Sequence, residues 1–217
     1  MLISRPFYIW QQSICWSFII ISGFCFLLGK HHLKRNLLCL GGGILISCVT
    51  SLLLPEERDL FGVLWMLGCS GLLMILWDKI YKKYFPSQKS SALVGLIISL
   101  FLFVLFRNVN SGYLGFEGFN FAELPQGLYK GYFMTFLGFM DPSFYSSDYF
   151  SLIPWVFLYF AGYYIKLLTA NTEFENVVLK KSVPGFEFVG KHSLIIYMCH
   201  QVVIFGLFYI CSIVIGQ

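Results

Sequence analysis

The residues best suited to chemistry lie near the end of the chain, in the segment GKHSLIIYMCHQ at positions 190–201. Lys191 and His192 stand at the start of an apolar run, and His200 and Gln201 follow about two turns further along. In a helix, four polar side chains of this segment fall on one face of about 100°: Ser193, Tyr197, His200 and Gln201. Polar groups at such depth line a functional path or hydrogen-bond neighbouring helices, and the segment alone leaves both interpretations open.

Further polar side chains lie where other apolar runs meet their polar flanks. Gln11 and Gln12 open the first run, where they either bind a polar ligand or are simply hydrated. Arg107 and Asn108 end the fourth run, and Asp148 begins the fifth. An Arg and an Asp at the same depth either form an ion pair or line a site that faces one aqueous side. We take these five residues, with Gln201, as candidate substrate-binding positions.

The composition is that of a polytopic membrane protein. Of the 217 residues, 58% are hydrophobic and 12% are charged, and the mean hydropathy is +0.74, whereas soluble domains carry about 25% charged residues. The net charge of +4 comes from basic residues scattered over short loops, which indicates membrane topology rather than nucleic-acid binding. All seven cysteines fall inside apolar runs without CxxC spacing, so we interpret them as packing residues and predict neither a disulfide nor a metal site.

The pattern of apolar runs predicts an all-α fold, a polytopic transmembrane helical bundle that forms a single domain over residues 1–217. About six spans are expected, at positions 8–29, 36–54, 60–77, 91–106, 149–169 and 190–214. Residues 107–148 carry eleven Phe or Tyr residues, whereas a disordered linker would be poor in aromatics. We expect this segment to be an ordered extracytoplasmic cap with its aromatic side chains at headgroup depth. Small residues recur every four positions in the second span and predict a close helix contact: Gly43, Ser47 and Ser51.

Lysine and arginine predict how the spans are oriented. Positions 30–35, 78–90 and 166–191 hold eleven of the fifteen Lys and Arg residues. Because basic residues concentrate in cytoplasmic loops, these three segments should be cytoplasmic, and the chain should begin on the extracytoplasmic side of the cell membrane. The few residues before Tyr8 are too short for a signal peptide, so we expect one further helix upstream of Met1.

Several stretches resemble one family of transmembrane acyltransferases. They are WQQSICWSFIIISGFCFLLGKHHLKR (10–35), LLLPEERDLFGVLWMLGCSGLL (52–73), SSDYFSLIPWVFLYFAGYY (146–164) and FVGKHSLIIYMCHQ (188–201). On these stretches the chain resembles small bacterial members of the family that contains the heparan-α-glucosaminide N-acetyltransferase catalytic domain. The chain departs from the family pattern at two positions near its end, where Lys191 replaces an Arg and Val202 replaces a Pro.

The resemblance implies that an acetyl group moves from cytoplasmic acetyl-CoA to an amine or hydroxyl of an extracytoplasmic sugar or glycolipid. It assigns Lys191, His192 and Ser193 to the CoA end of a tunnel and gives His200 a supporting catalytic role. The family's principal catalytic histidine lies on an additional first helix, and nothing before Tyr8 matches that helix. The implied partners are membrane lipids and the saccharide acceptor, and a homo-oligomer is compatible with this reading.

Two other functions use the same residues differently. A non-catalytic membrane remnant or partner would explain the expected loss of the first helix. A small-molecule transporter would use the polar stripe as its path, although the chain lacks the inverted repeats of secondary carriers. The sequence contains none of the common soluble-enzyme motifs, such as GxSxG, a P-loop or HExxH.

Overall fold

The computed structural model describes residues 5–53, 55–85 and 89–170, together with isolated positions of the last segment. Those positions are 172–173, 175, 188, 190, 192–197, 199 and 211. The chain divides into two compact units, Met1–Ala170 and Asn171–Gln217, and each is described by itself. The first unit is mostly helical and contains a two-stranded sheet.

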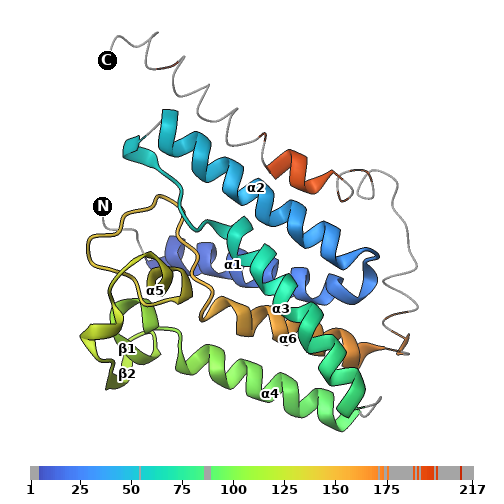
Figure 1. The fold of residues 1–217 in the computed structure, drawn as a ribbon. Coiled ribbons are helices and arrows are strands. Elements are labelled where there is room, and N and C mark those ends of the chain that lie inside the picture. Colours follow the sequence, from blue (N-terminus) through green and yellow to red (C-terminus); the bar gives the residue numbers. More distant parts are fainter. Residues whose placement is uncertain are drawn as a thin grey trace. The chain divides into compact units, whose positions relative to one another are not determined.

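Four long helices form the body of the first unit (Figure 1). They are α1 (Arg5–Phe24), α2 (His32–Leu53), α3 (Val63–Tyr84) and α4 (Lys89–Leu105). A short 3-10 helix, Cys25–Leu28, continues α1 toward α2. All four are long and apolar enough to cross a membrane, because a helix needs about 20 apolar residues to do so. The first four predicted spans thus coincide with helices that are candidate membrane spans.

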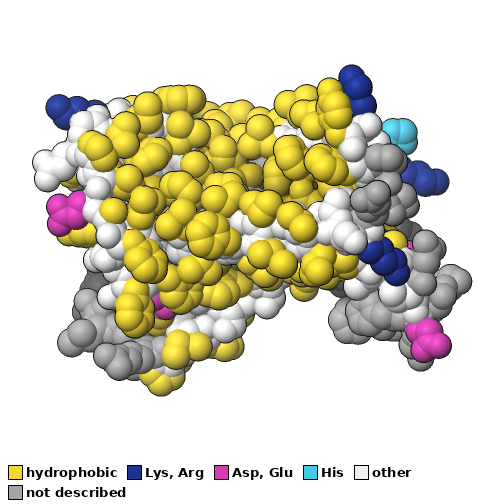
Figure 2. Space-filling model, turned by 90° about the horizontal axis from the view of Figure 1, so that it is seen from below, with side chains coloured by type: hydrophobic (Ala, Val, Ile, Leu, Met, Phe, Trp, Pro, Cys, Tyr) yellow, Lys and Arg dark blue, Asp and Glu magenta, His cyan; other side chains and the backbone are white. Residues whose placement is uncertain are grey.

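The surface of these helices is apolar as well. Large hydrophobic side chains are exposed on all four of them, among others Ile9, Leu38, Leu76 and Phe101. Figure 2 shows hydrophobic side chains covering the middle of one face, with charged side chains at its two edges. Such a large apolar surface is expected where lipid rather than water surrounds the protein.

The third helix corrects one predicted loop. Residues 78–90 were expected to lie in a loop, but α3 runs on to Tyr84 and α4 begins at Lys89. The added helical turns hold a salt bridge between Asp78 and Lys82, spaced i and i+4, with an Oδ2–Nζ distance of 2.7 Å. The Tyr163 hydroxyl donates to the other oxygen of the same carboxylate at 2.7 Å. The Asp78 carboxylate therefore has one partner on its own helix and one on Tyr163, so this charged residue is compatible with a continuous helix.

Helix α6 (Trp155–Thr169) corrects the start of the predicted fifth span, 149–169. Its 15 residues extend for about 22 Å, which is less than the thickness of about 30 Å of a hydrocarbon core. The chain before it does not continue the helix, because the N–H groups of Leu152 and Ile153 donate to carbonyls of helix α5 (Tyr132–Leu137), each at 2.9 Å. The described part of the chain thus contains four candidate spans and one shorter buried helix. The predicted sixth span, 190–214, lies largely outside the described residues.

Residues 107–154 form a folded cap, which we call the hairpin end. The cap contains strands β1 (Tyr113–Phe116) and β2 (Phe119–Glu123), which pair antiparallel, and the short helix α5. Short 3-10 turns, Val109–Ser111 and Gln126–Leu128, join these elements. The expected ordered segment is thus present, although its strands were not foreseen. In Figure 1 the connections between α1 and α2 and between α3 and α4 lie at the opposite end of these helices.

Glycines bring α1 and α6 into backbone contact. A Cβ added at Gly23 would lie 1.9 Å from the Tyr159 carbonyl oxygen, and one at Gly162 would lie 2.1 Å from the Ile20 carbonyl oxygen. Only residues without a side chain allow two helix backbones to approach so closely. This contact fixes α6, and with it the indole of Trp155, relative to α1.

The small-residue stripe on α2 contacts α3. A Cβ at Gly43 would already lie 3.0 Å from the Trp65 backbone nitrogen. The Trp65 indole N–H donates to the Ser47 hydroxyl at 3.0 Å. Ser51, in contrast, is exposed. The predicted helix contact is confirmed at its first two positions.

Candidate functional site

Arg107 is the centre of the most polar cluster at the hairpin end. It directly follows α4, and its side chain is only 13% exposed. One guanidinium nitrogen, Nη2, donates to the Gln12 carboxamide oxygen at 2.9 Å. The buried Nε has no hydrogen-bond partner among the described residues. Because an unpaired buried donor is costly, Nε is well suited to receive an acceptor atom from a ligand.

Helix α1 supplies one wall of this cluster. Tyr8, Gln12 and Cys15 follow each other at i, i+4 and i+7, so they share one helix face. The Tyr8 hydroxyl donates to the Glu117 carboxylate at 3.0 Å, and Arg107 Nη2 donates to the same hydroxyl at 3.4 Å. Arg107 and Glu117 also form a salt bridge of 3.6 Å. Glu117 lies between the two strands, so these contacts hold the β-hairpin against α1.

An aromatic wall covers the guanidinium plane. The Arg107 Cζ lies 5.1 Å from the ring centroid of Trp155, the first residue of α6. Phe103 and Phe150 pack against that indole with centroid distances of 5.8 and 5.4 Å. A guanidinium stacks favourably on an indole face, and the interaction strengthens when water is excluded. The wall therefore orients the guanidinium.

Asp148 is the second ionisable group of the site. Burial raises the pKa of its carboxyl group above the ordinary value of 3.8, and the Val63 backbone N–H partly offsets this effect. Among the described residues, Arg107 pairs with Glu117 and forms no salt bridge with Asp148. Of the two predicted arrangements, the direct ion pair is therefore not formed, and the shared site stays a prediction.

The hairpin end thus holds two buried groups that can take part in chemistry, a guanidinium and a carboxyl group. A buried, oriented guanidinium stabilises negative charge that develops on an oxygen. A carboxyl group with a raised pKa exchanges a proton closer to neutral pH than an ordinary aspartate does. Within the described chain, no group of three His, Cys, Asp or Glu residues is placed to hold a metal ion.

The other sequence-predicted residues of this end lie apart from the guanidinium. Gln11 is exposed and points about 100° away from Gln12 around the helix. Asn108 ties the hairpin together, since its side-chain amide donates to the Asn120 oxygen at 3.1 Å and its backbone N–H donates to the Gly115 carbonyl at 3.1 Å. The structure thus brings together two of the predicted substrate-binding residues, Gln12 and Arg107.

The predicted donor residues belong to the second unit. His192 and Ser193 are described and exposed, and the His192 ring packs on Phe188 at 4.5 Å between centroids. Residues 193–197 are helical, as predicted. Lys191, His200 and Gln201 lie outside the described residues. Their predicted roles remain predictions.

The site also contains residues that sequence reasoning missed. Tyr8, Glu117 and Trp155 complete the surroundings of Arg107. The aromatic residue at the start of α6 carried a signal, because it follows Pro154 at the boundary of an apolar run. No sequence pattern pointed to Glu117, because its position near Arg107 depends on the pairing of β1 and β2.

Comparison with known proteins gives a family match that covers most of the chain. Residues 1–202 match the model of a family described as heparan-alpha-glucosaminide N-acetyltransferase, catalytic. Neither the curated proteins nor the solved structures contain a match to this chain. The match spans every element described above, including α1, the hairpin end and α6.

Proposed function

Because this chain belongs to the heparan-α-glucosaminide N-acetyltransferase catalytic family, we propose that it is an integral-membrane acyltransferase. It transfers an acetyl group from cytoplasmic acetyl-CoA to an amine or hydroxyl of an extracytoplasmic sugar or glycolipid. The observation that carries this proposal is the family match over residues 1–202. The buried Arg107 guanidinium, held by Gln12 and Glu117, and the buried Asp148 carboxyl group at the same end support it.

The hairpin end is the acceptor side in this proposal. Basic residues are concentrated at the other end of the helices, in the segments 30–35 and 78–90, which supports a cytoplasmic location for that end. The donor then enters from the basic end of these helices. Lys191, His192 and Ser193 remain the proposed contacts for the CoA phosphates. Lysine is a common phosphate-binding residue, which supports this assignment.

The proposed step conserves atoms and charge. The acceptor nitrogen or oxygen attacks the carbonyl carbon of the acetyl thioester, and its proton passes to the Asp148 carboxylate. Arg107 stabilises the oxyanion that forms on the carbonyl oxygen. The carbon–sulfur bond then breaks, and the sulfur leaves as the CoA thiolate. His200 remains a proposed supporting catalytic residue.

The experiment is acetyl transfer by the purified chain in detergent, with radiolabelled acetyl-CoA and glucosamine. Asp148→Asn should lower kcat by about 100-fold or more, the range of general acid–base catalysis. Arg107→Gln should lower kcat by a similar factor, since one lost oxyanion donor typically costs about 100- to 1,000-fold. Glu56→Gln is the matched control, because Glu56 is exposed on the connection between α2 and α3.

The control should keep the rate of the unchanged protein. Equal rates for all three variants would show that neither Arg107 nor Asp148 takes part in the reaction. Absence of any transfer by the unchanged chain, with acetyl-CoA bound or not, would favour a non-catalytic role.

A further inference from the structure

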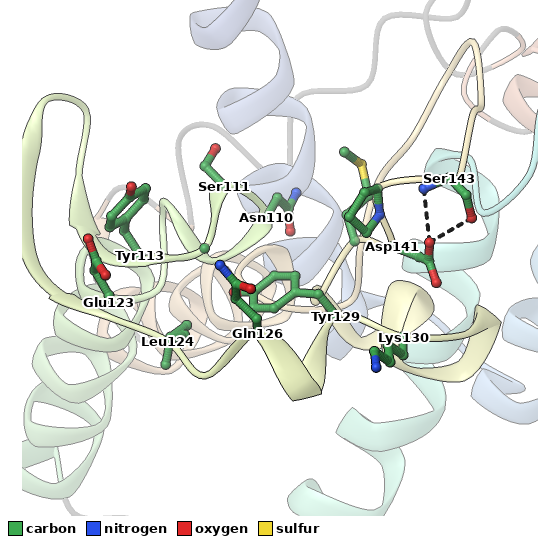
Figure 3. A pocket seen from close by; sticks show the side chains of 13 residues that line it. Asn110, Ser111, Tyr113, Glu123, Leu124, Gln126, Tyr129, Lys130, Asp141 and Ser143 are labelled. Carbon is green, nitrogen blue, oxygen red and sulfur yellow. Dashed lines mark hydrogen bonds between the residues drawn. The ribbon is translucent and has the colours of Figure 1, made fainter.

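The hairpin end also carries a groove that the reaction described above does not use. It has a volume of about 820 Å³ and is lined by residues from the segments 110–113, 123–130 and 140–143. Figure 3 shows Tyr113 and Glu123 at one end of this hairpin groove and Lys130 toward the other. Its size falls in the range of about 300–1,000 Å³ typical of small-molecule sites.

The middle of the hairpin groove is rigid. Tyr129 lies there beside Gln126 (Figure 3), and its hydroxyl donates to the Val109 carbonyl at 2.7 Å. The Phe139 ring packs edge-on against the Tyr129 ring, with 5.6 Å between centroids. A ring held at its hydroxyl and on one side keeps a fixed orientation, so its binding surface exists before a ligand arrives.

The loop that closes one end is also held in place. The Asp141 carboxylate accepts hydrogen bonds from the Gly131 N–H at 2.8 Å and from the Ser143 N–H and hydroxyl at 2.9 and 2.7 Å. These bonds lower the pKa of Asp141 to about 2, so the carboxylate stays charged. At the other side the Leu124 N–H donates to the Gly112 carbonyl at 2.9 Å.

The lining excludes several ligand classes. Its ionisable acids, Glu123 and Asp141, are accompanied by one basic side chain, Lys130, which disfavours a phosphate-rich ligand. Amide, hydroxyl and carboxylate groups along the groove disfavour an acyl chain, which would leave them without water or partners. What fits is a ligand with many hydroxyl groups and flat apolar faces, because tyrosine rings stack on such faces while the polar groups bind the hydroxyls.

We propose that the hairpin groove binds an oligosaccharide of at least two rings. The two tyrosines, Tyr113 and Tyr129, lie at separate positions along the groove (Figure 3), so a ligand with two or more rings can stack on both. Asn110, which lines the groove, lies three residues after Arg107 in the sequence, and its side-chain oxygen accepts from the Ser151 hydroxyl at 3.1 Å. That the bound oligosaccharide is the acetyl acceptor rests on the proposed function; that it binds in the groove does not.

Saturation-transfer NMR on the purified full chain tests the proposal, with a glucosamine disaccharide and with glucosamine as probes. We expect the disaccharide to bind at least about 10-fold more tightly than the monosaccharide, because a second ring adds stacking and hydrogen bonds. Tyr113→Ala and Gln126→Ala should each weaken disaccharide binding by about 5-fold, the effect of one stacking contact or one neutral hydrogen bond. Gln126 is exposed, so its replacement tests the groove even if the tyrosine variant fails to fold.

Phe121→Ala is the matched control, since Phe121 is an exposed aromatic residue of the same hairpin that does not line the groove. It should leave disaccharide binding unchanged. Absence of binding, equal affinity for both probes, or equal loss in the control would overturn the proposal. Groove-dependent binding without acetyl transfer would refute the proposed function alone, whereas transfer with no effect of the groove variants would refute this inference alone.

Discussion

Replacing Gly162 by alanine should push α6 away from α1 and disturb the Arg107 site at a distance. The new Cβ would start 2.1 Å from the Ile20 carbonyl oxygen, and ordinary contact begins at 3.4 Å. The two backbones must therefore separate by about 1.3 Å, the difference of these two distances. Such overpacking destabilises by about 1–3 kcal/mol, and the better helix propensity of alanine offsets up to about 1 kcal/mol of it.

With this offset the net loss is up to about 2 kcal/mol, which corresponds to a decrease in Tm of up to roughly 8 °C for a chain of this size. Trp155 moves with α6, so its stacking on Arg107, now 5.1 Å from Cζ to centroid, should weaken as well. Acetyl transfer should consequently fall along with stability. Thermal unfolding in detergent and the radiolabel assay measure the two effects.

Gly41→Ala is the control for this experiment. Gly41 lies in α2, and a Cβ there meets no atom within 4 Å. The control should keep or slightly raise Tm, by the propensity effect of up to about 1 kcal/mol. If Gly162→Ala behaves like Gly41→Ala in both assays, the close contact of α1 and α6 does not position the site.

Three further outcomes are expected. Ser47→Ala should lower the free energy of unfolding by about 1 kcal/mol, because the Trp65 N–H loses its acceptor. Ser51→Ala, at an exposed position, should have no effect. Thermal unfolding of both variants measures the difference, and equal Tm values would contradict the role of Ser47. Burial raises the pKa of Asp148 in the folded state, so the free energy of unfolding should fall as pH rises above 3.8 through this folded-state pKa. Asp148→Asn should therefore raise Tm at pH 7 and remove this pH dependence. A lower Tm of this variant at pH 7 would contradict the claim that burial destabilises the charged carboxylate. A cysteine placed at Ser90 should be protected from a membrane-impermeant thiol reagent in intact cells while one at Phe121 reacts, and the opposite pattern would reverse the predicted orientation.

The hydropathy of the sequence predicted the long helices well, because each of them needs about 20 apolar residues and few other structures use such runs. It failed at residues 149–154, where Leu152 and Ile153 are apolar but hydrogen-bond to α5 instead of continuing a helix. It also failed at residues 78–84, where charged side chains suggested a loop although they bond within α3 and to α6. In both places the outcome depends on tertiary partners that local composition does not encode.

The candidate site was predictable only in part for the same reason. Arg107 and Asp148 stood out as charges at the ends of apolar runs, where an ionisable group is a functional hypothesis by default. The choice of Gln12 over its neighbour Gln11 follows from the face that α1 turns toward Arg107. The hairpin groove had no sequence signal, because its walls come from segments that meet only after β1 and β2 have paired.

Transfer across the membrane tests the central claim most directly. Inverted membrane vesicles that contain the full chain would receive radiolabelled acetyl-CoA outside and hold a glucosamine disaccharide inside. The account predicts labelled disaccharide in the lumen, reduced about 100-fold or more by Asp148→Asn and unchanged by Glu56→Gln. A lumen without labelled saccharide, or equal labelling with both variants, would contradict it.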